Sequence, residues 1–190
     1  ASFSLPLAHA DSPTPPKIGL VMKSLANEFF VTMTKGAEDY QKQHPADFVL
    51  ITNGIKNETD PQGQLDIINQ MIVAQVDGLV IAPADSKALI NALQKAQDAG
   101  IVVVNIDNQL DPQVLKSKKM DVPFVGPDNR AGARKVGEYL ASKLNAGDEV
   151  AIIEGVSTTT NAQQRTAGFT DAMNAAQIKV VSTQSGNWEI

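Results

Sequence analysis

The architecture of this chain follows from one stretch, KIGLVMKSLANEFF, at residues 17–30. Its apolar run from Ile18 to Met22 has the length of a buried strand and is too short for a typical helix. A polar loop follows at residues 23–27. From Phe30 to Tyr40, apolar residues then recur every three or four positions, as they do on one face of a helix. The stretch therefore predicts a strand that runs through a short loop into a helix.

The loop after this strand has the composition of a binding site. Ligands of open parallel α/β sheets bind beside the loops at the carboxyl ends of the strands. Here Asn27 comes just before Phe29 and Phe30. Aromatic rings can cover the apolar face of a small flat ligand, and an amide can hydrogen-bond to its hydroxyl groups. The loop therefore predicts a site for a small polyhydroxylated molecule.

The same order of strand, loop and helix recurs along the chain. Strands are predicted at 18–22, 48–51, 79–81, 101–106, 122–125, 150–153 and 178–181, and helices at 29–40, 65–72, 87–98, 128–144 and 162–176. We expect the stretch from Leu110 to Val122 to be irregular, with a solvated basic cluster at residues 116–119. Repetition of this kind is typical of βαβ units, so the sequence predicts an α/β fold with parallel sheets.

The composition argues against several classes of protein. The chain has 190 residues, 43% of them hydrophobic, which suffices for one domain with a core, or for one domain and part of a second. A net charge of -5 and a pI near 5.0 do not resemble the basic footprint of a nucleic-acid binder, so we expect no nucleic-acid partner. No apolar run is long enough to span a membrane. The absence of cysteine excludes thiol chemistry and Cys-based metal sites.

The first ten residues, ASFSLPLAHA, have the character of a signal peptide. They are small and apolar, and they end in Ala8-His9-Ala10, the pattern of a bacterial cleavage site. The charged start of such a peptide is missing. We therefore expect residues 1–10 to be a signal-peptide remnant and residues 11–16 to be a flexible leader. The alternative is a disordered tail that was never a signal.

The residues needed for catalysis are scarce. The only histidines are His9 and His44, which leaves almost no material for a Ser-His-Asp triad or a His-based metal site. No phosphate-binding glycine motif follows the first strand. Asp128 and Glu154 form a conceivable acid–base pair, but Asp128 is better explained as a helix cap. We therefore expect no enzymatic activity, no metal and no cofactor.

Polar and aromatic residues instead gather just past the ends of predicted strands. The candidate ligand-binding residues are Asn27, Phe29, Phe30, Asp107, Asn108, Arg165 and Trp188. Asp and Asn offer acceptors and donors to neighbouring hydroxyl groups, Arg adds a rigid fork of donors, and Phe and Trp offer stacking faces. Each residue alone has a structural explanation: Phe30 suits a core, Arg165 a surface ion pair and Trp188 simple packing. Their joint position after strand ends favours a binding site.

Several short segments carry a resemblance to a known family. They are Ser24–Phe30 (SLANEFF), Ile81–Ser86 (IAPADS), Val104–Asp107 (VNID), Gly126–Asn129 (GPDN) and Gln164–Phe169 (QRTAGF). From Lys17 to Ile190 the chain resembles the type I periplasmic sugar-binding proteins of ABC transporters, and most closely the ribose-binding branch. The resemblance implies two Rossmann-like parallel-sheet lobes that close on a sugar. It places an N-terminal lobe at residues 17–126 and a partial C-terminal lobe at 127–190, so we expect the chain to be truncated at both ends. The alternative is a compact single domain that ends here.

The resemblance also implies a function. It places Asn27, Phe29, Phe30, Asp107, Arg165 and Trp188 at sugar-contacting positions, whereas Asn108 stands where ribose binders usually carry arginine. That difference leaves a monosaccharide as the expected ligand but keeps aldoses, ketoses and sugar alcohols open. The implied protein is a periplasmic monomer that hands its sugar to a membrane permease. The alternatives are the effector domain of a lactose-repressor-type regulator and an α/β enzyme that acts on a sugar or nucleotide.

Overall fold

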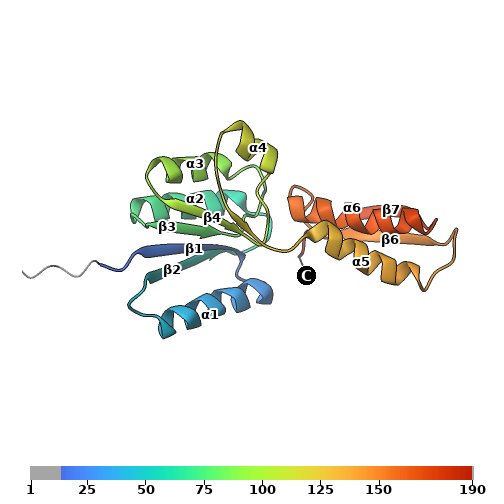
Figure 1. The fold of residues 1–190 in the computed structure, drawn as a ribbon, viewed down its shortest axis with the longest axis horizontal. Coiled ribbons are helices and arrows are strands. Elements are labelled where there is room, and N and C mark those ends of the chain that lie inside the picture. The colour runs from blue at the N-terminus through green and yellow to red at the C-terminus, as the bar shows by residue number, and fades with distance from the viewer. Residues whose placement is uncertain (1–13, 190) are drawn as a thin grey trace, which may run out of the picture.

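The structure, a computed structural model, describes residues 14–189, which form two parallel sheets with helices packed on them (Figure 1). The strands are β1 (Lys17–Ser24), β2 (Val49–Ile55), β3 (Gly78–Ile81), β4 (Val102–Ile106), β5 (Phe124–Val125), β6 (Glu149–Glu154) and β7 (Lys179–Ser185). The helices are α1 (Glu28–Gln43), α2 (Pro61–Val73), α3 (Ile90–Asp98), α4 (Pro112–Ser117), α5 (Asn129–Ala141) and α6 (Thr160–Ala175). The predicted α/β fold with parallel sheets is confirmed.

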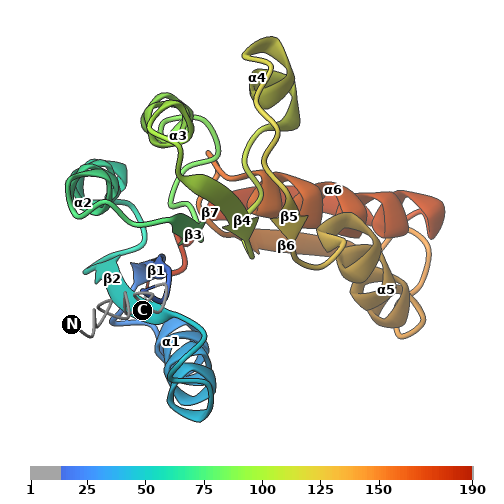
Figure 2. The same ribbon diagram turned by 60° about the vertical axis from the view of Figure 1, so that its left-hand side comes forward.

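The first sheet has the strand order β2-β1-β3-β4-β5, and every neighbouring pair is parallel. Helices α2 and α3 cover one face of this sheet, and α1 covers part of the other (Figure 2). β1 lies between β2 and β3, and residues 19–24 within it are buried because helices flank both faces. We call this part the five-stranded unit. β5 lies at its edge, where Pro123 is tolerated because its missing N–H is not needed by a further strand.

The core of the five-stranded unit has two parts. The larger part lies between the sheet and helices α2 and α3, and includes Ile68, Leu79 and Leu93. The smaller part lies under α1, where Phe30 packs with Leu20 and Met22. Both parts are built from residues between 20 and 122, so this unit buries its own apolar side chains.

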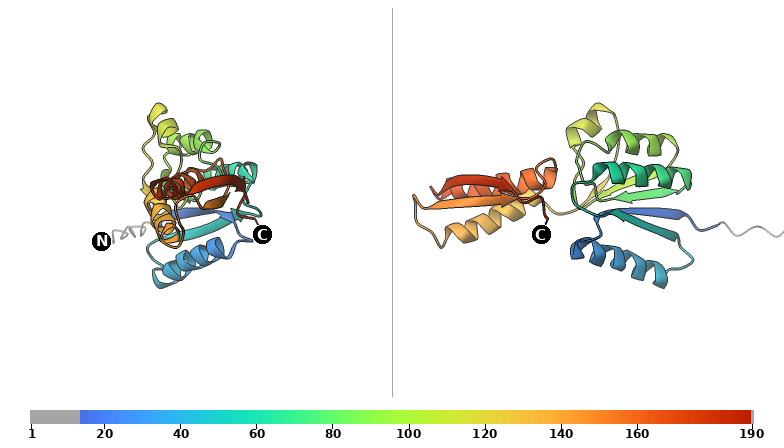
Figure 3. Two further views of the ribbon diagram at one scale, coloured as in Figure 1. Left: turned by 90° about the vertical axis from the view of Figure 1, so that its right-hand side faces the viewer. Right: turned by 180° about the vertical axis from the view of Figure 1, so that it is seen from behind.

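The second sheet consists of β6 and β7 alone, which pair in parallel and carry α5 and α6. We call this part the two-stranded unit. Its core is small and centres on Ala172, Met173 and Ile178. Figure 3 shows it beside the five-stranded unit, with the end of the described chain at the junction. The chain crosses from one unit to the other between β5 and α5.

Two local predictions were wrong. The helix predicted at 87–98 begins at Ile90, because Asp85 accepts hydrogen bonds from the backbone N–H groups of Lys87 and Ala88 and holds a turn there. The stretch 110–122 was expected to be irregular but contains α4. Asp111 caps that helix, and Pro112 occupies its first turn, where no N–H partner is needed.

Among residues 14–189, no helix combines the length and the apolar composition that crossing a membrane requires. The same part of the chain holds no group of three or more His, Cys, Asp or Glu side chains that could bind a metal ion. The predicted signal peptide at residues 1–10 lies outside the described residues.

Candidate functional site

A cavity of about 150 Å³ lies where the two units meet. It is lined by Lys23, Asn27, Phe29, Phe30, Glu58, Asp107, Asn108, Arg165 and Trp188. These residues come from the carboxyl ends of β1, β2, β4 and β7 or the loops that follow them, and from helices α1 and α6. The carboxyl ends of parallel strands share one edge of a sheet, so loops that are far apart in sequence converge there. All seven residues named from the sequence line this cavity, and their role as ligand contacts stays a prediction.

The aromatic side chains form the apolar part of the cavity wall. Phe29 and Phe30 meet edge to face, with ring centroids 5.1 Å apart. Phe29 is 54% exposed, whereas Phe30 is 4% exposed and belongs to the core under α1. Trp188 comes from the two-stranded unit and lies close to Gly155, where an added Cβ would come within 1.9 Å of the indole ring. Gly155 therefore leaves the space that this ring occupies.

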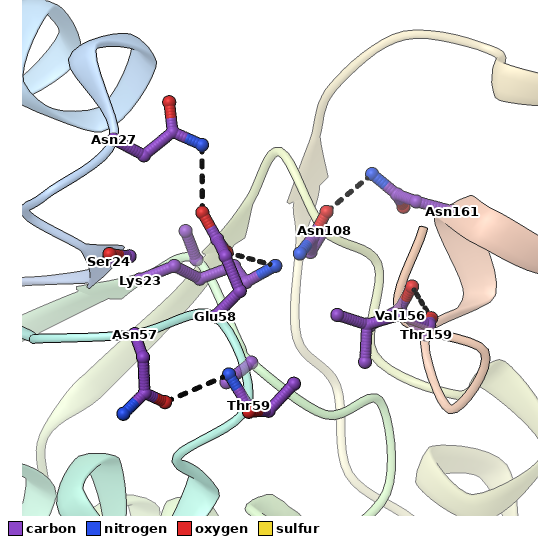
Figure 4. Close-up of polar contacts among 12 residues, drawn as sticks. Lys23, Ser24, Asn27, Asn57, Glu58, Thr59, Asn108, Val156, Thr159 and Asn161 are labelled. Atoms are coloured by element: carbon purple, nitrogen blue, oxygen red, sulfur yellow. Dashed lines mark hydrogen bonds and ion pairs between the residues drawn. The ribbon is translucent and has the colours of Figure 1, made fainter. Parts of the chain in front are cut away.

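A buried ion pair joins Lys23 and Glu58 at the base of the cavity (Figure 4). The Lys23 Nζ lies 2.8 Å from Glu58 Oε2, and both side chains are almost inaccessible, at 1% and 2% exposure. Asn27 Nδ2 donates to Glu58 Oε1 at 2.8 Å. Burial lowers the pKa of Lys23, and the hydrogen bond and charge of Glu58 oppose that shift. The Lys23 Nζ also lies 4.2 Å from the centroid of the Trp188 ring, a cation–π distance.

The sequence patterns do not single out Lys23 or Glu58 as site residues. Lys23 was assigned to the loop, although it is the seventh residue of β1, and Glu58 was one polar residue in a polar loop. The one available signal was a lysine that directly continues an apolar strand. Such a lysine needs an acid nearby if it is buried. The sequence does not say that Glu58, 35 positions away, is that acid.

Asp107 and Arg165 supply a second pair of opposite charges. Burial raises the pKa of Asp107, and the positive charges of Arg165 and Lys23 oppose the shift. The Asp107 backbone has a φ of 54°, a left-handed conformation that turns the chain sharply at the end of β4. Arg165 is oriented by Asn129, whose Oδ1 accepts a 2.6 Å hydrogen bond from the Arg165 Nε. With Lys23 and Glu58, the cavity therefore carries two positive and two negative groups, which balance.

Asn108 lies at the cavity with its side chain engaged by the protein. It is 3% exposed. Its Nδ2 donates to the Pro83 carbonyl oxygen at 3.1 Å, and its Oδ1 accepts from Asn161 Nδ2 at 2.6 Å. The contact between Asn108 and Asn161 is visible beside the Lys23–Glu58 pair in Figure 4. Asn108 thus has protein partners on both ends of its amide, as does Asn27, whose Nδ2 donates to Glu58 Oε1 and whose Oδ1 accepts from the Phe29 N–H; of the two, Asn108 is the one with a partner in the two-stranded unit.

A larger cavity of about 710 Å³ lies within the two-stranded unit, between α5, β6 and α6. It shares Arg165 and Trp188 with the first cavity, but its lining is more apolar and includes Val136, Ile152 and Ile153. Ile153 is 82% exposed, so this space is an open groove on an uncovered sheet face. The smaller cavity is the better candidate site, because charged, amide and aromatic groups converge on it from both units.

Comparison with known proteins gives consistent results. The family model for the periplasmic binding protein domain matches residues 18–190. The D-ribose/D-allose-binding protein of Pseudomonas aeruginosa is 70% identical over all of this chain and 60% of its own length. An ABC transporter solute-binding protein from Burkholderia multivorans superposes with a TM-score of 0.90 at 70% identity, over 92% of this chain and 62% of that one. A periplasmic solute-binding protein from Actinobacillus succinogenes with bound D-allose gives 0.82 at 36% identity, over 92% and 60%. The chain therefore spans about 60% of the length of the relatives it matches.

Proposed function

The chain belongs to the periplasmic binding protein domain family, and from that premise we propose that it is the sugar-binding component of an ABC transporter. In this proposal the protein binds one monosaccharide between its two units in the periplasm, as a monomer, and delivers it to a membrane permease. It makes and breaks no covalent bond in the sugar. The five-stranded unit corresponds to an N-terminal lobe at residues 17–126, and the two-stranded unit to part of a C-terminal lobe at 127–190.

The observation that carries this proposal is the composition of the 150 Å³ cavity. Its two positive and two negative groups balance, which suits a neutral ligand that needs many hydrogen bonds. Aromatic side chains from both units offer faces to the apolar side of a sugar ring. The volume is well below the roughly 300–1,000 Å³ of pockets for drug-sized molecules, so a single small ring fits better than an oligosaccharide.

We assign roles according to this geometry. Asn27, Asp107 and Arg165 hydrogen-bond to sugar hydroxyl groups, while Phe29, Phe30 and Trp188 pack against the ring. Lys23 and Glu58 add a donor and an acceptor at the base of the cavity. The names of the similar proteins point first to aldoses, D-ribose and D-allose. Neither the family match nor the similar structures support the regulator alternative.

The test is a binding screen of the protein as its cell produces it. Thermal unfolding is measured with D-ribose, D-allose, D-fructose and myo-inositol, with maltose as a ligand too large for the cavity. At a hundred-fold excess over Kd, a true ligand stabilises the folded state by about 2.7 kcal/mol. We expect such stabilisation from at least one monosaccharide and none from maltose, with the sugar recovered unchanged by chromatography. Absence of stabilisation with every monosaccharide and polyol would contradict the proposal, as would chemical conversion of the sugar.

A further inference from the structure

Asn161, at the start of α6, reaches across the junction with every polar atom of its side chain. Its Nδ2 donates to Asn108 Oδ1 at 2.6 Å and to the Asp107 carbonyl oxygen at 3.0 Å. Its Oδ1 accepts from the backbone N–H of Gln109 at 3.1 Å. The side chain is 1% exposed. Asn161 lies in the two-stranded unit, and all three partners lie in the loop after β4 of the five-stranded unit. Figure 4 shows the contact with Asn108.

The loop after β4, which Asn161 contacts, is held in place by hydrogen bonds within the five-stranded unit. Asn105, on β4, donates to the Asn108 carbonyl oxygen at 2.7 Å and accepts from the Leu110 N–H at 2.8 Å. Asn108 is anchored in turn through its Nδ2 to the Pro83 carbonyl oxygen. The loop therefore presents two acceptors and one donor in fixed positions, and the primary amide of Asn161 matches that set.

A second contact supports the first. The backbone N–H of Thr160, beside Asn161, donates to Ser86 Oγ at 2.8 Å, and Ser86 Oγ donates to the Gln109 carbonyl oxygen at 2.7 Å. Ser86 is buried in the five-stranded unit. The start of α6 is thus bound to the five-stranded unit at two places: the Asn161 side chain binds the loop after β4, and the Thr160 backbone N–H binds Ser86. Buried amides with all partners satisfied hold one arrangement in preference to others, because any displacement leaves polar groups unpaired.

We propose that Asn161 and Asn108 form a contact between the two units, which we call the amide clasp. This contact sets the fraction of sugar-free protein molecules in which the two units are joined. Asn161 is a positioning residue: it brings Arg165, one turn further along α6, and Trp188 up to the residues of the five-stranded unit. Asn108 acts as the clasp's receiving partner rather than as a sugar contact. This inference rests on the proposed function only in its effect on sugar affinity.

The clasp should act on affinity through the population of the joined form. Apparent Kd equals the intrinsic Kd divided by the fraction of protein that is competent to bind. Removing three satisfied hydrogen bonds disfavours the joined form, so Asn161→Ala should raise the Kd for the sugar by about ten-fold or more. Saturating sugar should still join the units, because its own contacts span the junction.

The experiment measures distance and affinity in the same protein. The chain lacks cysteine, so Lys95→Cys on α3 and Asn174→Cys on α6, both exposed, place one label on each unit. Single-molecule energy transfer then reports the distance between units with and without sugar. We expect Asn161→Ala to lengthen that distance in the sugar-free protein and sugar to restore it. Asn91→Ala, an exposed amide on α3, is the matched control and should change neither quantity.

Two further variants make the result decisive. If Asn161→Ala fails to fold, Asn161→Ser keeps a small polar group and takes its place. In Asn108→Ala combined with Asn161→Ala, the loss of affinity should equal that of one single variant, because the two residues act as a unit. Additive losses would return Asn108 to the sugar contacts and overturn its assignment. An unchanged distance in sugar-free Asn161→Ala would overturn the clasp, whereas absence of sugar binding by the unaltered protein would contradict the proposed function instead.

Discussion

Phe29 and Phe30 are neighbours in sequence with different physical roles. Phe30 is packed in the core under α1, whereas more than half of Phe29 is exposed at the cavity. We expect Phe30→Ala to lower the free energy of unfolding by about 3–5 kcal/mol, because it leaves a hole in a packed core. Phe29→Ala should change that free energy by roughly 0.5 kcal/mol or less but weaken sugar binding several-fold.

Urea denaturation and calorimetric titration of both variants separate these effects. Tyr139→Ala is a suitable control, because this ring is exposed on α5 and lines neither of the two cavities described above. It should leave both stability and binding close to those of the unaltered protein. Equal losses of stability in the two Phe variants would show that the exposure of the rings does not determine their roles.

The carboxyl group of Asp107 makes the stability of the folded protein depend on pH. Its pKa is raised by burial, so the folded protein holds this proton more tightly than the unfolded chain does. The stabilisation from protonation is complete below the ordinary pKa of 3.8 and is lost as the pH rises through the raised value. At neutral pH the buried carboxylate therefore disfavours folding. Asp107→Asn should unfold at a higher urea concentration at pH 7, and this gain should shrink as the pH falls towards 3.8.

The same variant should bind sugar less tightly, by roughly ten-fold, because a charged acceptor is replaced by a neutral one. Asparagine tolerates the left-handed backbone at this position, so the turn should survive. Urea titrations between pH 4 and pH 8, with Asp98→Asn on the exposed face of α3 as control, check the prediction. A stability gain that does not depend on pH would rule out the carboxylate's burial as its cause.

At the scale of single residues, the sequence predicts which residues lie at the site better than it predicts which residues they contact. The seven candidate residues could be named because each follows the end of a predicted strand, which is local information. The Lys23–Glu58 pair could not, because the partner of a buried charge depends on which loops the sheet brings together. Asn108 shows the same limit: its place was predictable, but its engagement by Asn161, 53 positions away, was not.

At the scale of helices and strands, the spacing of apolar residues predicts the longer helices, and capping residues mark where several of them begin. Asn27, Asp60, Asp128 and Thr159 each accept a hydrogen bond from the first turn of a helix. These signals lie within a few residues and can be read directly. The missed helix α4 has such a cap as well, at Asp111, but it is only six residues long and shows little apolar periodicity. Short helices are therefore where sequence patterns give the least information.

The contact between α5 and α6 depends on two glycines. An added Cβ at Gly168 would lie 2.1 Å from the Arg130 carbonyl oxygen, and one at Gly137 would lie 2.7 Å from Ala172 Cβ. Backbone atoms cannot move aside as a flexible side chain can. We expect Gly168→Ala to lower the free energy of unfolding by about 1–3 kcal/mol, because the helices must separate to admit the methyl group.

Gly132→Ala is the control on the same helix pair, since an added Cβ there meets nothing within 4 Å. It should stabilise the protein by about 0.5–1 kcal/mol through helix propensity alone. The single tryptophan, Trp188, reports unfolding near the junction by its fluorescence. A Gly168→Ala protein as stable as Gly132→Ala would mean that the close approach of α5 and α6 contributes nothing.

At the scale of the whole molecule, the two units differ in how well each buries its apolar surface. The five-stranded unit has a helix on each face of its sheet and a core drawn from its own residues. The two-stranded unit leaves Ile153 and Val181 largely exposed. Parallel βαβ units were predictable from the rhythm of the sequence. The contacts between the units were not, because they join loops from opposite ends of the chain, such as the Glu58 N–H and the Glu189 carboxylate.

This difference predicts how the chain behaves when it is divided between β5 and α5. Residues 14–126 should fold alone and unfold cooperatively in urea, because five strands and their helices enclose an apolar core. Residues 127–189 should lack a cooperative transition, since two strands with one uncovered face are marginal in water. Circular dichroism and amide proton spectra of the two separate fragments and of their equimolar mixture give the measurement.

Adding the first fragment to the second should restore only part of the order in the second, through the clasp and the Glu58–Glu189 contact. Those few hydrogen bonds are weak support for a unit that has so little core of its own. A sharp urea transition in residues 127–189 alone would show that α5 and α6 suffice to stabilise a two-stranded sheet. In that case the junction would add nothing to the folding of the second unit, and its polar contacts would serve binding alone.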